Sequence, residues 1–266
     1  INVLPAAYAS SNSVYCVFPR QFGPNMNLAK SRLPEGVTPK MLHILDRTGY
    51  SVIPPSGTFR GVVRNLNHIV DDLKCRIIHL LPVNPTPTTY ARMGRFGSPY
   101  ASQDFTEVDP ALAEFDVKAT PLEQFYELVD AVHRKNARVF LDLAINHTGW
   151  ASRLQTTKPN WFVRKDDKTY VSPGAWGVVW GDLVELNHDN RDLWKYLAKV
   201  FLTWCKRGVD GFRCDAGYMI PVEAWEYIIA VVRSEYPETV FLLEGLGGDP
   251  AITRNLLDQA NMNWAY

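Results

Sequence analysis

Short apolar runs follow longer amphipathic segments along most of this chain. Apolar residues recur at helical spacing within 118–136, and a short apolar run of strand length follows at 139–143. Thr120 is a suitable helix N-cap, Pro121 suits the first helical position, and Glu123 completes a capping box. This stretch therefore predicts a helix that starts after Thr120 and is followed by a strand.

The same order of helix and strand recurs before and after this stretch. Counted from the first apolar run, the pattern predicts strands at 14–18, 77–81, 139–143, 209–215, 239–245 and 263–266. Helices are expected between them at 66–74, 190–207, 221–236 and from 249 onward. Strands that alternate with helices at this spacing are typical of βαβ units and a parallel sheet. Six strands are an incomplete count for an eight-stranded barrel.

One stretch departs from this rhythm. Residues 147–187 are rich in Trp, Gly, Lys and Asp and lack helical periodicity. Loops of that length are uncommon unless they have structure or a function of their own. We therefore expect an inserted subdomain at 148–187, between a first part of the barrel at 1–147 with strands one to three and a continued part at 188–266 with strands four to six.

Composition narrows the classes of protein. The 266 residues are 46% hydrophobic and 21% charged, which suits a globular fold with a large core. Lys plus Arg and Asp plus Glu both number 28, so the formal net charge is zero and no basic field would attract nucleic acid. No apolar run reaches the length of a membrane helix, so the sequence predicts neither a nucleic-acid nor a membrane partner.

The cysteines and the chain start bear weakly on location. Cys16, Cys75, Cys205 and Cys214 are widely spaced without a CxxC pattern, which favours free thiols and a reducing compartment such as the cytoplasm over secretion. The chain begins at Ile1 without a Met and without a signal peptide pattern. It is therefore expected to be cut from a longer product, and its localisation stays open.

Polar groups collect where the predicted strands end. Asp142, Asn146 and His147 close the third strand, Asp215 closes the fourth, and Glu244 closes the fifth. In a parallel α/β sheet the loops at these carboxyl ends converge on a ligand. We expect the five side chains to form one site.

The spacing within two of these strands predicts a chemistry. Arg213 and Asp215 lie on one face of their strand, so the guanidinium should keep the carboxylate ionised as a nucleophile. Glu244 ends an apolar strand, where desolvation favours the protonated acid. A charged carboxylate and a protonated one are the pair that glycoside cleavage requires.

These segments resemble those of a known family. GFRCD, DLAINH and FLLEG are similar to three of the four signature segments of the alpha-amylase superfamily, which comprises retaining enzymes that act on α-glucosidic bonds. VYCVFPRQF resembles that family's first barrel strand, and FGSPYASQDF resembles the loop after its second strand. The resemblance extends from about residue 14 to 266 and implies a (β/α)8 TIM barrel, with strands one to about six present and a small domain inserted after strand three.

The resemblance also implies roles for single residues. Asp215 would be the nucleophile, Glu244 the acid/base and Arg213 the partner of the nucleophile. His147 would hydrogen-bond the sugar at the cleaved bond, and Tyr100 would stack on that sugar.

Further roles concern carboxylates, a metal and ring stacking. The resemblance makes Asp104 and Asp142 structural carboxylates near the site, and Asn146 occupies a position that supplies a calcium ligand in many members. No cofactor is required, and a structural calcium ion is possible at that position. In the insertion, Trp176 and Trp180 are candidate stacking platforms for a sugar.

Two departures from the family pattern bear on function. Tyr218 and Met219 stand where the family usually has a Lys and a His that border the acceptor side. The fourth signature segment, which supplies a third catalytic carboxylate, lies beyond the sixth strand. A C-terminal segment outside these residues, or a second chain, would therefore have to complete the barrel.

The sequence accordingly predicts an α-glucan-acting glycoside hydrolase that binds an α-linked oligosaccharide or polysaccharide and forms a glycosyl-aspartate intermediate. An α-glucan transglycosylase of the glucanotransferase or branching type, with the same catalytic residues, is the first alternative. A non-catalytic relative that serves as a binding or scaffold protein is the second, although the retained acid pair of Asp215 and Glu244 argues against it.

Overall fold

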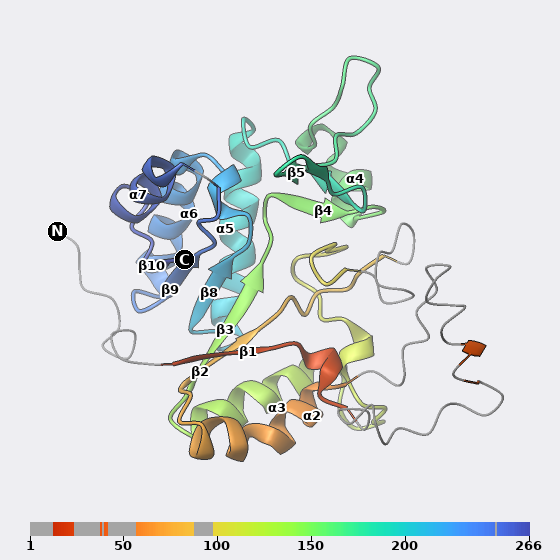
Figure 1. Ribbon diagram of the computed structural model, residues 1–266, viewed down its shortest axis with the longest axis vertical. Helices are drawn as coiled ribbons and strands as arrows, with labels where there is room; N and C mark the ends of the chain where they lie inside the picture. Colours follow the sequence, from red (N-terminus) through yellow and green to blue (C-terminus); the bar gives the residue numbers. More distant parts are fainter. Residues whose placement is uncertain (1–12, 24–37, 39, 42–56, 88–97, 248) are drawn as a thin grey trace.

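A computed structural model describes residues 13–23, 38, 40–41, 57–87, 98–247 and 249–266 of the chain. Its centre is one parallel sheet of six strands in the order β1-β2-β3-β8-β9-β10. The strands are β1 (Val14–Val17), β2 (Ile77–Leu80), β3 (Arg138–Leu143), β8 (Gly211–Cys214), β9 (Val240–Leu243) and β10 (Trp264–Ala265). Each strand pairs with the next one in the alternating βα pattern, and the sheet curls as part of a barrel (Figure 1). The predicted fold, six strands of a (β/α)8 barrel, is confirmed.

Helices connect these strands and cover the sheet. They are α2 (Phe59–Leu66), α3 (Pro121–Arg134), α5 (Arg191–Lys206), α6 (Val222–Glu235) and α7 (Pro250–Asp258). In Figure 1, α2 and α3 lie together at the bottom. Helices α5, α6 and α7 lie together at the upper left, near β8 and β9. Strands β2 and β8 are buried at every position, because a parallel sheet in this class is covered on both faces.

The predicted start of α3 is confirmed at the level of single hydrogen bonds. The Glu123 amide donates to the Thr120 hydroxyl at 3.2 Å, and the Thr120 amide donates to the Glu123 carboxylate at 2.7 Å. This reciprocal pair satisfies amides that the helix itself cannot bond. Helix α5 begins in a similar way, since the Asn190 side chain accepts from the Asp192 amide at 3.0 Å.

The first helix begins earlier than the pattern predicted. The expected span of 66–74 misses the first turns of α2, which starts at Phe59, and the chain continues as a π-helix at Asn67–Asp72. Helix propensity does not predict the first turns of α2, because they contain Gly61 and glycine disfavours a helix interior. Here a Cβ on Gly61 would lie 1.8 Å from the Phe22 carbonyl oxygen, so glycine allows the helix to approach the end of the 3₁₀ helix Pro19–Gln21 that follows β1.

Residues between β3 and α5 form small elements of their own, at the top of Figure 1. Strand β4 (His147–Gly149) pairs antiparallel with β7 (Leu183–Glu185), and β5 (Gly174–Ala175) forms a hairpin with β6 (Val178–Val179). Helix α4 (Arg153–Thr157) lies in the same segment. This segment also contains a short 3₁₀ helix at Pro159–Trp161. Elsewhere in the described residues, short 3₁₀ helices occur at Pro19–Gln21, Pro110–Leu112 and Gly217–Met219. Because β4 follows β3 directly, this insertion is placed at the carboxyl end of the third barrel strand.

The cysteines differ in their surroundings. All four are free thiols among the described residues, as their spacing predicted: Cys205 and Cys214 are buried, Cys16 is exposed on β1 and Cys75 is intermediate. No helix in the described part of the chain is both long enough and apolar enough to span a lipid bilayer.

Candidate active site

Charged side chains meet at the carboxyl ends of β3, β8 and β9. The register pairs Asp142 of β3 with Arg213 of β8, so these side chains lie next to each other. Arg213 Nη1 donates to both Asp142 oxygens at 3.0 Å and to Asp215 Oδ1 at 2.5 Å. Arg213 Nη2 lies 3.1 Å from Glu244 Oε1. One guanidinium thus contacts three carboxylates, and the structure brings together Asp142, Arg213, Asp215 and Glu244 as expected from their strand-end positions.

Asp142 is the buried centre of this cluster. Its side chain is 0% exposed, and it also contacts His79 Nε2 at 3.2 Å and accepts from the Tyr100 hydroxyl at 3.4 Å. Burial would lower the pKa of His79, but its bonds to Asp142 and Cys16 outweigh burial and raise this pKa to about 9. His79 on β2 therefore adds a second positive charge beside Asp142, a role that the sequence reasoning did not assign.

The electrostatics of Asp215 differ from the expectation. We expected Arg213 to keep this carboxylate ionised, but burial first, and then the charge of Asp142, raise the pKa of Asp215 to about 8 despite the opposing effect of Arg213. Arg213 also contacts Asp142 and Glu244, and its charge does not outweigh the burial of Asp215. The spacing of Arg213 and Asp215 in the sequence could not reveal that two other strands deliver acidic groups to the same guanidinium.

Ala216, the residue after Asp215, has a strained backbone conformation and contacts Glu244. Ala216 has a left-handed φ of 46°, which is uncommon for a residue with a Cβ. In this conformation its amide donates to Glu244 Oε2 at 2.6 Å. The residue after Asp215 thereby helps to hold Glu244, whose other oxygen faces Arg213.

Tyr266 is a further member of the cluster. Its hydroxyl accepts from Arg213 Nε at 2.9 Å and from Arg213 Nη2 at 2.7 Å. The guanidinium carbon also lies 5.8 Å from the ring centroids of both Tyr100 and Tyr266. Sequence reasoning assigned no role to Tyr266, although its place at the end of the sixth predicted strand was a usable signal.

A pocket of about 190 Å³ opens above these carboxylates. Its lining residues are Ser98, Tyr100, His147, Trp176, Trp180, Asp182, Leu183, Asp215, Tyr218 and Glu244. The predicted residues Tyr100, His147, Asp215 and Glu244 therefore face one cavity. The barrel supplies its floor, and the insertion supplies Trp176, Trp180, Asp182 and Leu183.

His147 is set up as a neutral hydrogen-bond donor. Burial lowers its pKa to about 3, so the ring is uncharged over the physiological range. The Asn146 amide nitrogen lies 3.4 Å from His147 Nδ1, which assigns the proton to Nε2. Nε2 has no hydrogen-bond partner among the described residues, while Trp180 contacts the ring edge-on with centroids 6.0 Å apart. A hydroxyl group in the pocket could accept from this nitrogen.

Two other predicted residues are placed differently. Asp104 accepts from Thr106 at 2.9 and 2.7 Å and from Arg153 at 2.9 Å, and it lines a separate hollow rather than the pocket above Asp215. It therefore does not join the carboxylate cluster. The residue holds the loop after β2 against α4.

Asn146 was predicted as a calcium ligand. The contacts of its amide nitrogen are His147 Nδ1 at 3.4 Å and Met219 Sδ at 3.8 Å, whereas calcium takes six to eight oxygen ligands. The described residues also contain no group of three or more His, Cys, Asp or Glu side chains that could hold a metal ion. The calcium site at Asn146 therefore stays a prediction from the resemblance.

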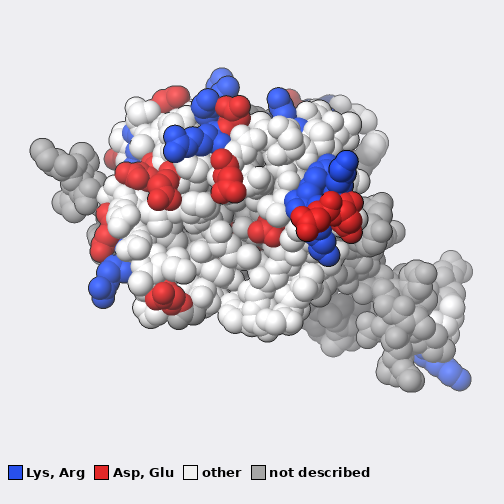
Figure 2. Space-filling model, turned by 90° about the horizontal axis from the view of Figure 1, so that it is seen from above, with Lys and Arg blue, Asp and Glu red and all other residues white. Residues whose placement is uncertain are grey.

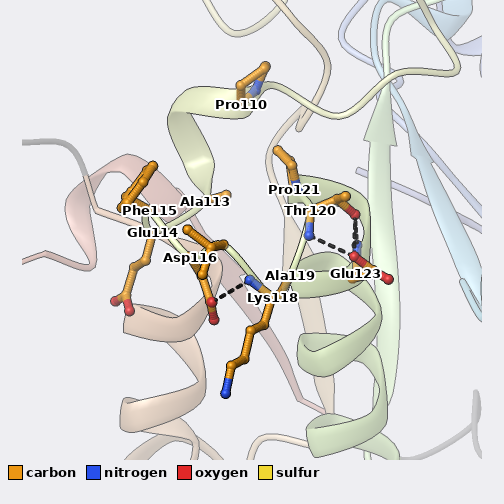
Figure 3. Close-up of a pocket in the computed structure, with 11 residues that line it drawn as sticks. Pro110, Ala113, Glu114, Phe115, Asp116, Lys118, Ala119, Thr120, Pro121 and Glu123 are labelled. Atoms are coloured by element: carbon orange, nitrogen blue, oxygen red, sulfur yellow. Dashed lines mark hydrogen bonds between the residues drawn. The ribbon is translucent and has the colours of Figure 1, made fainter.

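A wider hollow of about 500 Å³ lies elsewhere, between the loop at 110–119 and the first turn of α3 (Figure 3). Its polar groups are largely paired with one another, as in the Thr120 and Glu123 capping box and in the bond from the Lys118 amide to Asp116. It shares no lining residue with the pocket above Asp215. We therefore assign the candidate site to the smaller pocket.

The surface charge is mixed on the face seen in Figure 2. Lys and Arg side chains lie in small groups beside Asp and Glu. That face presents no broad basic field of the kind that binds a phosphate backbone.

Comparison with known proteins gives consistent matches. The family model described as "Alpha amylase, catalytic domain" matches residues 3–240. The alpha-1,4-glucan:maltose-1-phosphate maltosyltransferase of Picrophilus torridus is 25% identical over 206 residues, covering 73% of this chain and 32% of the relative. The protein of the same name from Burkholderia pseudomallei is 32% identical over 206 residues, covering 71% and 17%.

Solved structures match over more of the chain. The alpha-amylase from Lactobacillus plantarum has a TM-score of 0.67 and 30% identity, covering 88% of this chain and 45% of that one. The debranching enzyme of Nostoc punctiforme has a TM-score of 0.70 and 23% identity, covering 100% and 53%. The chain thus spans about half of these structures and a third or less of the two maltosyltransferases.

Proposed function

Because the chain belongs to the alpha-amylase family, we propose that its pocket binds an α-linked glucan and cleaves the α-glucosidic bond by a retaining double displacement. The observation that carries this proposal is the contact of Arg213 with Asp142, Asp215 and Glu244 beneath the pocket. Retaining enzymes hold their two carboxyl groups about 5–5.5 Å apart, and the contact of Asp215 and Glu244 with the same guanidinium supports such a pair.

In the first step, Asp215 attacks the anomeric carbon while Glu244 donates a proton to the glycosidic oxygen. The carbon–oxygen bond to the leaving sugar breaks, and an ester between Asp215 and the retained sugar forms. In the second step, Glu244 takes a proton from the acceptor hydroxyl, which displaces Asp215. The neutral His147 would donate from Nε2 to a hydroxyl of the bound sugar in both steps.

The catalytic cycle needs one proton on the pair formed by Asp215 and Glu244. Burial and the charge of Asp142 raise the pKa of Asp215 to about 8, so this carboxyl group tends to hold a proton in the free protein. Catalysis requires the proton on Glu244 and an ionised Asp215. We propose that the pair holds one proton in the free state and that the reactive form has it on Glu244.

We further propose transfer to a sugar acceptor as the main outcome, with hydrolysis second. The two maltosyltransferase relatives support transfer by name, so the alternative from the sequence is better supported than its hydrolase preference. Tyr218, at the position expected to border the acceptor side, lines the pocket with two tryptophans. Such an aromatic wall suits a sugar ring better than a water molecule. The 30% identical alpha-amylase supports the hydrolytic alternative.

Product analysis on the full-length protein tests this proposal. The protein is incubated with maltotetraose, and separately with maltose-1-phosphate and a maltooligosaccharide acceptor. Products longer than the acceptor support transfer, and only shorter products support hydrolysis. Absence of turnover on both mixtures, with unchanged behaviour of Asp215→Asn in a glucan-binding assay, would favour the non-catalytic scaffold.

A further inference from the structure

Trp176 is at the tip of the hairpin formed by β5 and β6, where it lines the pocket above Asp215 and Glu244. Its side chain is nevertheless 68% exposed, so the ring is not part of the hydrophobic core. An exposed aromatic ring beside a candidate sugar site has no packing role that would explain its presence.

The backbone at Trp176 strengthens this point. Trp176 and Gly177 are the two residues between the strands, with φ angles of 52° and 77°. Tight hairpin turns with two positive φ angles strongly favour Asn, Asp or Gly, and a bulky aromatic residue there is unusual. The hairpin would form more easily with Asn at this position. Local strain that folding does not require is typical of residues kept for function.

The size of the pocket indicates what the ring could contact. At about 190 Å³ the pocket is smaller than the 300 Å³ or so at which sites for larger ligands begin, so it suits a single sugar ring. The next ring of an α-glucan must then lie outside, along the rim. Val178 and Val179, which are 53% and 66% exposed, extend the apolar surface of the hairpin beyond Trp176.

We propose that Trp176 stacks on the sugar ring next to the one held in the pocket and is a specificity-determining residue for oligosaccharides. This inference rests on the proposed function of the pocket. Trp180 differs from Trp176, because its ring contacts His147 and therefore belongs to the wall around the first sugar. The hairpin thus sets a preference for substrates of more than one ring without touching the reacting atoms.

The test compares a long and a single-ring substrate in the full-length protein. Trp176→Asn removes the ring and places a favoured residue in the turn, so folding should be kept or improved. We expect kcat/KM for maltotetraose to fall roughly three- to tenfold, the loss expected for one stacking contact. Turnover of α-glucosyl fluoride, which carries a single ring, should fall less than that of maltotetraose, because Trp176 reaches the first sugar only from the edge of the pocket. Trp176→Tyr should restore most of the maltotetraose activity.

Lys168→Asn is the matched control. Lys168 also has a left-handed φ, of 66°, in the same insertion, but it does not line the pocket. This variant should leave both substrates unaffected. If the wild-type protein does not use the fluoride, the affinity of Asp215→Asn for maltotetraose, with and without Trp176→Asn, gives the same comparison.

The outcomes separate the two proposals. An equal loss for both substrates, or no loss for either, in an active protein would overturn the role of Trp176 and leave the proposed function intact. A wild-type protein that neither turns over nor binds α-glucans would instead contradict the proposed function. A greater loss for the longer substrate supports the inference.

Discussion

The floor and the rim of the pocket are built in opposite ways. The floor consists of side chains at the ends of regular strands, such as Asp142 and Arg213, which are 0% and 6% exposed. The rim includes Trp176, which is 68% exposed and occupies a strained two-residue turn. Backbone ladders fix the floor residues to one geometry, whereas a short hairpin holds the rim. In the proposed function, the sheet therefore carries the chemistry and the insertion adjusts which ligands fit.

The two regions also differ in electrostatic cost. The floor collects three carboxylates around Arg213, and burial of Asp215 beside Asp142 disfavours its charged form. The rim carries the aromatic rings of Trp176 and Trp180, which could stack on a ligand without burying a charge. Substitutions in the floor should therefore change both turnover and stability, whereas substitutions in the rim should have smaller and more selective effects.

The largest effect is expected from Asp215→Asn. An amide cannot form the glycosyl ester, so turnover of a maltooligosaccharide should fall by more than about 1,000-fold. Circular dichroism should show an unchanged fold, because Asn keeps the size of the side chain. Turnover within tenfold of the wild-type value would exclude Asp215 as the nucleophile.

Arg213→Lys should come next. Lysine keeps the charge but cannot donate at the same time to Asp142, Asp215 and Tyr266, so we expect a loss of more than about 100-fold in turnover. Unfolding should become easier by roughly 2–4 kcal/mol in urea titrations, because buried carboxylates lose partners.

Arg233→Lys is the control for that substitution. Arg233 donates to the Asn261 carbonyl and to Asn263 Oδ1, and it does not line the pocket. This variant should lose stability without losing turnover. Equal effects of the two variants on turnover would show that Arg213 acts only through the fold.

His147→Ala should have an intermediate effect. Removal of the Nε2 donor should lower kcat/KM by roughly 10- to 100-fold, the loss expected when a polar contact to the substrate is removed. Because burial keeps the pKa of His147 near 3, its loss should reduce activity by the same factor throughout the neutral range. A factor that depends on pH between about 5 and 8 would contradict a neutral ring.

The pH dependence of stability should report on Asp215 in the floor of the pocket. The folded-state pKa of Asp215 is raised to about 8 from 3.8, so the native state holds a proton that the unfolded state has lost in this window. Stability should therefore fall as the pH rises between these values, by at most about 1.4 kcal/mol per pH unit.

Asp215→Asn should remove that decline. His79 has a pKa raised from 6.5 to about 9, so it stabilises the fold at low pH and loses this effect as the pH rises toward 9. Below about pH 6.5 the buried His147 and His188, with pKa values of about 3 and about 4, oppose this decline, because they stabilise the fold as the pH rises. The difference in stability between the wild type and Asp215→Asn at each pH therefore isolates Asp215. An unchanged slope in the variant would show that the cluster loses its proton elsewhere.

The smallest effect is expected in the rim and its surroundings. Lys168→Asn replaces a non-glycine residue with φ of 66° by one that tolerates this conformation. The free energy of unfolding should therefore rise by up to about 1 kcal/mol, and the melting temperature should rise slightly. Thermal unfolding monitored by circular dichroism measures this change. A loss of stability would mean that the Lys168 side chain contributes contacts in the folded state.

The features that the sequence could predict are those that depend on neighbouring residues or on the ends of regular strands. Local signals were sufficient for the α3 capping box at Thr120 and Glu123, because its hydrogen bonds join residues three apart. The strand ends at Asp142, Asp215 and Glu244 could be placed because parallel strands align their carboxyl ends. Tyr266 was missed, although it ends the sixth predicted strand and the same alignment of strand ends places it beside Arg213.

The sequence by itself determined the alternation of helices and strands, the curved parallel sheet and the strand ends that carry the acid pair. These features follow from short-range periodicity and from the family resemblance of a few contiguous segments. The tertiary structure alone decided that Arg213 is shared among three carboxylates, that Asp104 lies apart, and that Trp176 reaches the pocket. Those outcomes depend on distances between residues far apart in the chain, and on burial, which no local pattern encodes.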